Sequence, residues 1–96
     1  DYTKAIEIDP NLVGAYNNRG NIYQTKGDFN QAISDYTKAI EIDSKYADAY
    51  YNRALTYYLK QDYAKAWNDV HTAESLGFNS NPDFLEELKK ASGIEK

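Results

Sequence analysis

Asp1-Tyr2-Thr3-Lys4-Ala5-Ile6-Glu7-Ile8-Asp9 decides the fold of this protein, because the same nine residues return without a change as residues 35–43. The offset between the two copies is 34 residues. An identity of this length indicates a duplicated structural unit, and a period of about 20–50 residues is typical of proteins built from stacked repeats. Such an architecture favours binding over chemistry.

The same offset aligns many further residues, and the aligned positions are apolar or small at intervals of three, four or seven. That spacing marks one face of a helix and not of a strand. The pattern therefore predicts helices over 15–26 and 29–42 in the first complete unit, over 49–60 and 63–76 in the second, and a last helix from Pro82. With no strand signal, the predicted fold class is all-α.

The two turns between paired helices differ in one residue. Gly27 can take the left-handed conformation that ends helices, and Asp28 with Gln31 forms a plausible capping box for the next helix. One period later Gln61 stands in place of the glycine. We therefore expect the second turn to be more strained or to have a different shape.

The aligned face carries a family signature, Tyr16-x-x-Arg19-Gly20-x-x-Tyr23 with Ala32-x-x-x-Tyr36 and Ala39, and its copy Tyr50-x-x-Arg53-Ala54-x-x-Tyr57 with Ala66-x-x-x-Val70 and Ala73. This pattern resembles the tetratricopeptide repeat. The resemblance implies a right-handed α-solenoid of antiparallel helix-turn-helix repeats. It divides the chain into half a repeat (1–12, a second helix only), full repeats over 13–46 and 47–80, and a closing helix over 81–96.

The two ends of the chain differ. The closing helix has Asn81 as a good N-cap and Pro82 at its first helical position. The half-repeat has no preceding helix, and repeats contact mainly their neighbours, so its apolar residues are expected to stay uncovered. Self-association through this end is our hypothesis, with the candidate residues Tyr2, Ala5, Ile6 and Ile8.

Composition excludes several classes of function. The net charge of −4 argues against general nucleic-acid binding, and no apolar run approaches the length of a membrane span. The chain has no cysteine, so there is no disulfide framework, and cysteine content does not indicate the cellular compartment of the protein. His71 is the only histidine, and it lacks the convergent partners of a general base or a metal ligand. We expect it to face solvent, and we predict no enzyme activity, no cofactor and no metal site.

One pairing of opposite charges recurs. Arg19 precedes Asp35 by 16 residues, and Arg53 precedes Asp69 by the same interval. We favour a structural interpretation, in which each arginine reaches an aspartate on an adjacent helix. The alternative is an arginine that binds an anion from solution.

The resemblance also implies a concave groove, lined by the first helix of each repeat, in which an extended peptide or a partner helix lies. The positions that carry over are Gly14, Asn17, Asn21, Gln24 and Thr25 in the first repeat and Asp48, Tyr51, Leu55, Tyr58 and Leu59 in the second. The amides could hydrogen-bond an extended backbone, and the tyrosines and leucines could form an apolar patch. An open alternative is that the closing helix covers Leu55, Tyr58 and Leu59 through Phe84 and Leu85.

Some members of the family that this chain resembles hold the acidic C-terminal tails of heat-shock chaperones in a two-carboxylate clamp. In the family, the clamp has cationic residues at the positions where this chain has Asn17, Pro82 and Glu86. The two asparagines of the clamp match Asn21 and Asn52 of this chain. Because every cation is missing, we expect no binding of such tails. The predicted function is a protein-interaction scaffold that binds a peptide or protein segment, and the alternative is a module that oligomerises through its N-terminal half-repeat.

Overall fold

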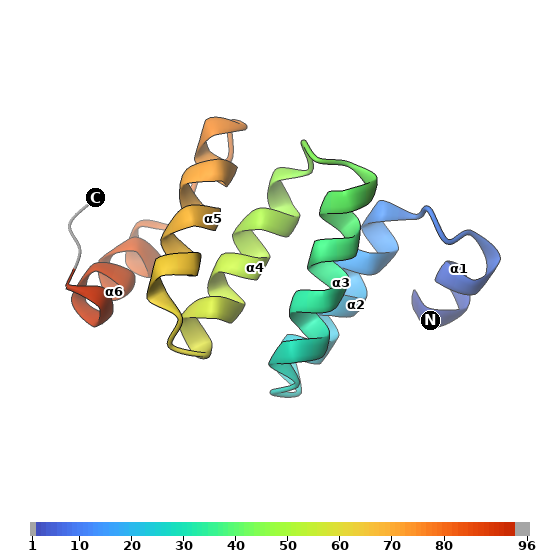
Figure 1. The fold of residues 1–96 in the computed structure, drawn as a ribbon, viewed down its shortest axis with the longest axis horizontal. Helices are drawn as coiled ribbons and strands as arrows, with labels where there is room; N and C mark the ends of the chain where they lie inside the picture. Colours follow the sequence, from blue (N-terminus) through green and yellow to red (C-terminus); the bar gives the residue numbers. More distant parts are fainter. Residues whose placement is uncertain (1, 94–96) are drawn as a thin grey trace.

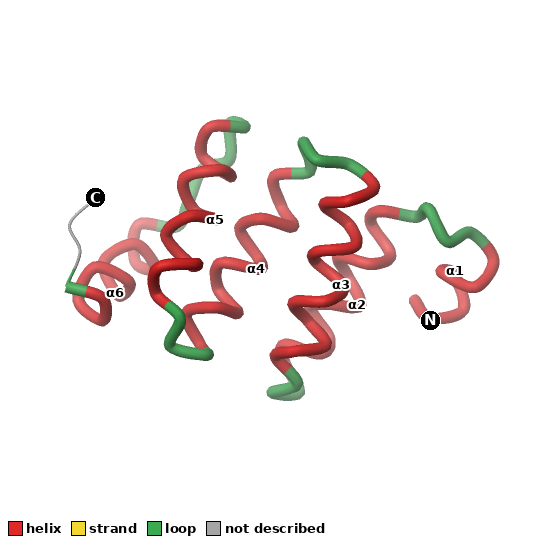
Figure 2. Tube along the Cα trace, in the orientation of Figure 1, coloured by secondary structure: helices red, strands yellow, loops and turns green. Residues whose placement is uncertain are grey.

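The computed structural model describes residues 2–93, except for the side chain of Tyr2, and this part of the chain is helical with short connections (Figures 1 and 2). Its helices are α1 Tyr2–Ile8, α2 Val13–Thr25, α3 Phe29–Ile42, α4 Ala47–Leu59, α5 Tyr63–Ser75 and α6 Pro82–Ser92. The helices predicted from periodicity all occur, with ends within two residues of the predicted ones. No strand occurs between residues 2 and 93, so the all-α class is confirmed.

The helices follow one another along the longest axis of an elongated molecule of 43 × 27 × 18 Å (Figure 1). Helix α2 packs antiparallel to α3, and α4 packs likewise against α5, so each full repeat is one helical hairpin. Helix α3 joins the two repeats by packing against α4, while α1 and α6 cover opposite ends. The α-solenoid architecture is thereby confirmed.

The two hairpin turns have the same shape despite their different residues. Gly27 has φ 81° and Gln61 has φ 67°, so both lie in the left-handed region. The same hydrogen bond closes each turn, from Asp28 N to Tyr23 O at 2.8 Å and from Asp62 N to Tyr57 O at 2.9 Å. The expected difference in shape was wrong, whereas the strain that a side chain suffers at positive φ is present at Gln61.

Helix caps follow the sequence only in part. Asp28 stands at the N-cap of α3, but its side chain makes no cap hydrogen bond, so the predicted capping box was wrong. Asn81 caps α6 as predicted, because its Oδ1 accepts from Asp83 N at 2.8 Å and Pro82 follows as the first helical residue. Gly93 ends that helix with φ 70°.

One bidentate ion pair joins the two helices of each repeat. Arg19 Nε and Nη2 donate to the carboxylate of Asp35 at 2.7 and 2.8 Å, and Arg53 binds Asp69 at the same distances. Arg53 Nη1 also donates to Thr37 Oγ1 at 3.1 Å, which ties α4 to the preceding repeat. Both aspartates are buried, and their hydrogen bonds raise the pKa of each arginine. This confirms the structural interpretation of the pairs, since a guanidinium held by both oxygens of a carboxylate is committed to it.

Candidate functional site

Two of the candidate groove residues of the first repeat, Asn17 and Gln24, lie at the contact between α2 and α4. Asn52 Nδ2 on α4 donates to Asn17 Oδ1 on α2 at 3.0 Å. Gln24 lies two turns after Asn17 on α2, and Thr56 lies one turn after Asn52 on α4. Gln24 Nε2 donates to Thr56 Oγ1 at 2.7 Å and to Asn52 O at 3.3 Å. Side chains that were expected to await a ligand therefore join the two repeats to each other.

Asn17 and Asn21 differ in how much of their amide stays available. Asn17 is buried against Asn52, which corrects the expectation that it lines an open groove. Asn21 is half-buried, and its Oδ1 accepts from the hydroxyl of Tyr36 at 2.6 Å. Its Nδ2 has no hydrogen-bond partner among residues 2–93.

The hydrogen bond to Asn21 comes from Tyr36, a residue of the neighbouring helix α3. Its side chain is fully buried, and burial raises its pKa to about 12, a shift that a hydrogen bond with Thr56 opposes and the charge of Asp35 assists. Tyr36 therefore stays neutral and keeps donating to Asn21 over the whole physiological range.

The candidate residues of the second repeat lie under the closing helix. The ring of Phe84 meets the rings of Tyr51 and Tyr58 edge-on, with centroids 5.6 and 5.5 Å apart. Phe78 stacks on Tyr51 at 4.4 Å, and the hydroxyl of Tyr51 accepts from Asn81 N at 3.2 Å. Tyr51 is only 9% exposed, which corrects the expectation that it forms part of an open aromatic patch.

The remaining positions of that repeat range from covered to open. Leu55 and Tyr58 are half-buried and pack against the cluster that includes Phe84. The ring of Tyr58 contacts Phe84 directly, so the alternative in which the closing helix covers these positions holds for Tyr58 and is wrong for Leu59. Leu59 is 48% exposed, and Asp48 is also exposed. The other end of α6 is fastened by Trp67 Nε1, which donates to Ser92 Oγ at 3.0 Å.

The N-terminal end is only partly as expected. Ala5 and Ile6 are half-buried, and Ile6 packs against the cluster around Tyr16, so these two are not free as a patch. Ile8 is 76% exposed, while the side chain of Tyr2 lies outside the described residues. Sequence reasoning missed Ile22 on α2, which is 43% exposed. Its aligned residue Thr56 is polar, and that replacement was the available signal.

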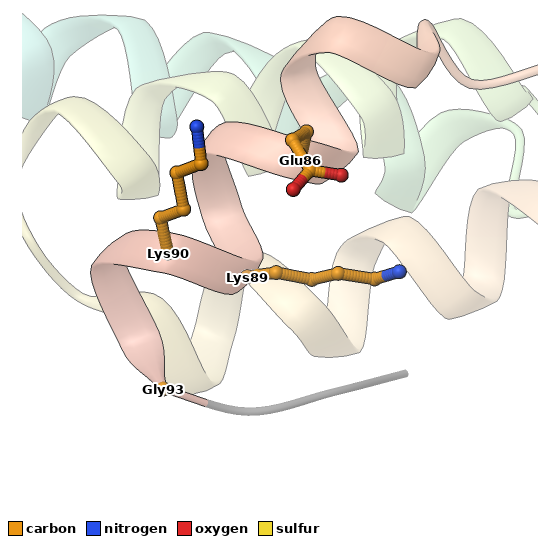
Figure 3. A pocket seen from close by; sticks show the side chains of 4 residues that line it. All are labelled: Glu86, Lys89, Lys90 and Gly93. Atoms are coloured by element: carbon orange, nitrogen blue, oxygen red, sulfur yellow. The ribbon is translucent and has the colours of Figure 1, made fainter.

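No other arrangement of side chains in the described range suggests chemistry. A hollow of about 330 Å³ beside α6 is lined by Glu86, Lys89, Lys90 and Gly93, but the two ammonium groups point away from each other (Figure 3). His71 is exposed and stacks on Trp67, with ring centroids 5.5 Å apart. Within residues 2–93 no three His, Cys, Asp or Glu side chains gather in a way that could hold a metal ion.

Comparison with known families settles the relationship of the chain. A model described as TPR repeat matches residues 20–61, and one described as tetratricopeptide repeat matches residues 1–34. The chain belongs to the tetratricopeptide repeat family. No match was found among curated protein sequences. Within the described range of this tetratricopeptide repeat chain, none of the helices combines the length and the hydropathy that crossing a bilayer requires.

Several solved tetratricopeptide structures share the fold. YrrB, described as a TPR protein with an unusual peptide-binding site, is 31% identical with a TM-score of 0.83, over 94% of this chain and 46% of YrrB. The present chain thus spans about half the length of YrrB. The first TPR of Spaghetti (RPAP3), bound to the HSP90 peptide SRMEEVD, is 29% identical with a TM-score of 0.85, over 96% and 72% of the two chains. The TPR2B domain of yeast Sti1, in a complex with pHsp70, is 26% identical with a TM-score of 0.82, over 96% and 77%.

Proposed function

We propose that this chain is a protein-interaction scaffold that binds a peptide or protein segment on the face shared by α2 and α4. The relatives support this class of function, because one is solved with an HSP90 peptide and another in a complex with pHsp70. The fold that positions α2 beside α4 is common to all of them.

The observation that carries the proposal is a pair of side-chain amides, each with one hydrogen-bonding group still available, next to an exposed leucine. Asn21 Oδ1 accepts from Tyr36, and Gln24 Nε2 donates to α4. The Nδ2 donor of Asn21 and the Oε1 acceptor of Gln24 therefore stay available for a ligand. A donor and an acceptor together can hydrogen-bond the main chain of an extended segment. Leu59 lies one helical turn beyond Thr56, the partner of Gln24, and offers an apolar contact beside them.

The partner is a segment without clustered acidic residues. Asn17, Pro82 and Glu86 stand where the chaperone-tail clamp wants cations, and Asn17 is buried against Asn52 as well. An acidic tail would lose hydration here without meeting a positive charge in return. Calorimetry with the peptide SRMEEVD should show no binding, and binding at micromolar peptide would contradict this part of the proposal.

Peptides selected from a random displayed library supply the probes for a direct test. We expect a selected peptide to bind the chain with a dissociation constant on the order of micromolar, because few repeats contact it. Leu59→Asp should abolish that binding in calorimetry. Leu76→Asp is the matched control, since Leu76 is also exposed but lies at the end of the α5 hairpin. Peptides that bind Leu59→Asp as well as the unchanged chain would refute the proposed face.

A second candidate function is association through the N-terminal end. It is favoured by the exposure of two large apolar side chains, Ile8 on α1 and Ile22 on α2. These two helices pack against each other. Sedimentation of the chain at several concentrations tests it, with Ile22→Asp as the comparison. A mass that stays monomeric at all concentrations would exclude association between identical copies.

A further inference from the structure

Two side-chain amides of α2 are each held at one end by the neighbouring helices. Asn21 Oδ1 accepts from the hydroxyl of Tyr36 on α3 at 2.6 Å. Gln24 Nε2 donates to the side chain of Thr56 and to the main chain of Asn52, both on α4. Within residues 2–93 the other end of each amide, Asn21 Nδ2 and Gln24 Oε1, has no hydrogen-bond partner. These are the two groups that the proposed function assigns to a ligand.

The chemistry of the held ends fixes which atom of each amide is left for a ligand. The main-chain oxygen of Asn52 can only accept, so the amino group of Gln24 must turn towards it. The 2.6 Å between Tyr36 Oη and Asn21 Oδ1 is the length of an O–H···O bond and is short for an N–H···O bond. The Tyr36 hydroxyl is therefore the donor, and the amino group of Asn21 is turned away from it.

The second repeat shows that packing does not require a hydroxyl at the position of Tyr36. The equivalent residue is Val70, which is also fully buried. In that repeat Leu55 takes the place of Asn21, so there is no amide to orient. Burying a hydroxyl costs free energy unless it is hydrogen-bonded, and Asn21 provides the acceptor in the first repeat. The buried position and the groove position thus differ together between the repeats.

We propose that Tyr36 is a positioning residue, which holds Asn21 as a hydrogen-bond donor beside the acceptor Gln24 and thereby selects the ligand. The chain then binds a segment that presents a main-chain carbonyl to Asn21 and an N–H group to Gln24. Because the same two amides carry the proposed function, the positioning role rests on it. The new element is that a buried side chain of α3, outside the groove, decides which end of the Asn21 amide a ligand meets.

A purely structural role for the Tyr36 hydroxyl predicts a different result. If the hydroxyl only stabilised the contact between α2 and α3, its loss would weaken ligand binding whatever residue stood at position 21. If it orients an amide, its loss matters only for a side chain whose two ends differ. Aspartate has the shape of asparagine but two equivalent oxygens, so turning its carboxylate changes nothing that a ligand meets.

The test is a double-mutant cycle of Asn21→Asp and Tyr36→Phe, measured by calorimetry with a peptide selected on the unchanged chain from the displayed library. Asn21→Asp should weaken binding about ten-fold, because the ligand carbonyl loses its donor. Tyr36→Phe should weaken binding about two-fold or more, since a released amide presents its donor about half of the time. In the Asn21→Asp chain, Tyr36→Phe should have no effect. Asn68→Asp adds the same charge at an exposed position of α5 and should leave the affinity unchanged.

Amide-to-ester replacements in the selected peptide provide a second measurement, which tests the acceptor at Gln24. An ester oxygen cannot donate a hydrogen bond, so the replacement that faces Gln24 should weaken binding to the unchanged chain. With Gln24→Ala that one replacement should lose its effect, whereas the others keep theirs. Ester effects that are all independent of Gln24 would overturn the assigned acceptor.

The remaining outcomes separate the positioning role from the proposed function. Equal weakening by Tyr36→Phe with Asn21 and with Asn21→Asp, or no weakening in either, would overturn the positioning role and leave the groove in place. Unchanged binding by Asn21→Asp would overturn the assigned donor. A Tyr36→Phe chain that circular dichroism shows to be unfolded would overturn the role as well, because the hydroxyl would then be needed for packing. Peptides that still bind Leu59→Asp would instead refute the proposed face itself.

Discussion

Gly20 lies directly against the ring of Tyr36: a Cβ atom on Gly20 would stand 2.7 Å from Tyr36 Cε1 and 2.9 Å from Cδ1. The ring is fully buried and its hydroxyl is held by Asn21, so it has no room to move away. The close approach of α2 to α3 therefore depends on the missing side chain.

Gly20→Ala is expected to destabilise the chain by about 1–3 kcal/mol through overpacking. Gly14→Ala is the matched control in the same helix, because its nearest atom would be Tyr46 Oη at an ordinary 3.9 Å. That control should be neutral or stabilise the fold by up to about 1 kcal/mol, as the better helix former. Urea unfolding of both variants measures the contrast, and a stable Gly20→Ala chain would show that α2 can shift outward.

Gln61→Gly is expected to raise the free energy of unfolding by about 0.5–1 kcal/mol, because φ 67° strains a side chain but not glycine. The reciprocal change Gly27→Ala, at φ 81°, should lower it by a similar amount. Thermal melting of both single variants checks the opposite signs. If Gln61→Gly melted at a lower temperature, the side chain of Gln61 would have to contribute more than its strain costs.

Arg53→Lys is expected to destabilise the fold by about 1–2 kcal/mol, because an ammonium cannot bind both oxygens of Asp69 and also reach Thr37. Lys65→Ala removes a more exposed charge, 3.8 Å from Asp62, and should change stability by less than about 0.5 kcal/mol. Urea midpoints of the two variants test this order. Equal effects would mean that the bidentate geometry contributes nothing beyond charge.

Tyr36 makes stability sensitive to alkaline pH. Its pKa is raised to about 12 in the folded chain, so its contribution is intact below about pH 10, the ordinary tyrosine value. Between these values the unfolded chain loses a proton that the folded chain keeps, and stability falls by up to about 3 kcal/mol as the pH rises. In Tyr36→Phe this part of the slope is absent, so the stability difference between the two chains should narrow from pH 9 to 12 in urea unfolding. Parallel slopes would contradict the assignment to Tyr36.

Phe84→Ala is expected to loosen α6 from α4, because the ring contacts both Tyr51 and Tyr58. The cost should be about 3 kcal/mol, as for other buried phenylalanines. Limited proteolysis between residues 76 and 81 and the fluorescence of Trp67 report the release, since Trp67 binds Ser92 at the far end of the helix. Leu85→Ala, at a half-buried neighbour, should have a smaller effect.

Periodicity alone located the elements correctly, since helix formation and helix pairing depend on residues three, four and seven apart. The Arg19–Asp35 and Arg53–Asp69 pairs were also predictable, because the repeat supplied the same spacing twice. The candidate site was less predictable. Asn17 and Tyr51 occupy positions that face outward on their own helices, and both are buried by residues more than 30 positions away.

The repeated nonapeptide and its period thus determined the all-α solenoid and its hairpins, because these follow from local spacing that the chain carries twice. The closing helix followed from its own start signals, Asn81 and Pro82. Tertiary packing decided which outward positions remain open. Phe84 of the closing helix covers Tyr51, and Asn52 of the second repeat covers Asn17. The absence of a covering helix leaves Ile22 exposed at the other end within the described structure. Exposure depends on what lies across an interface, and that is set only when the helices are stacked.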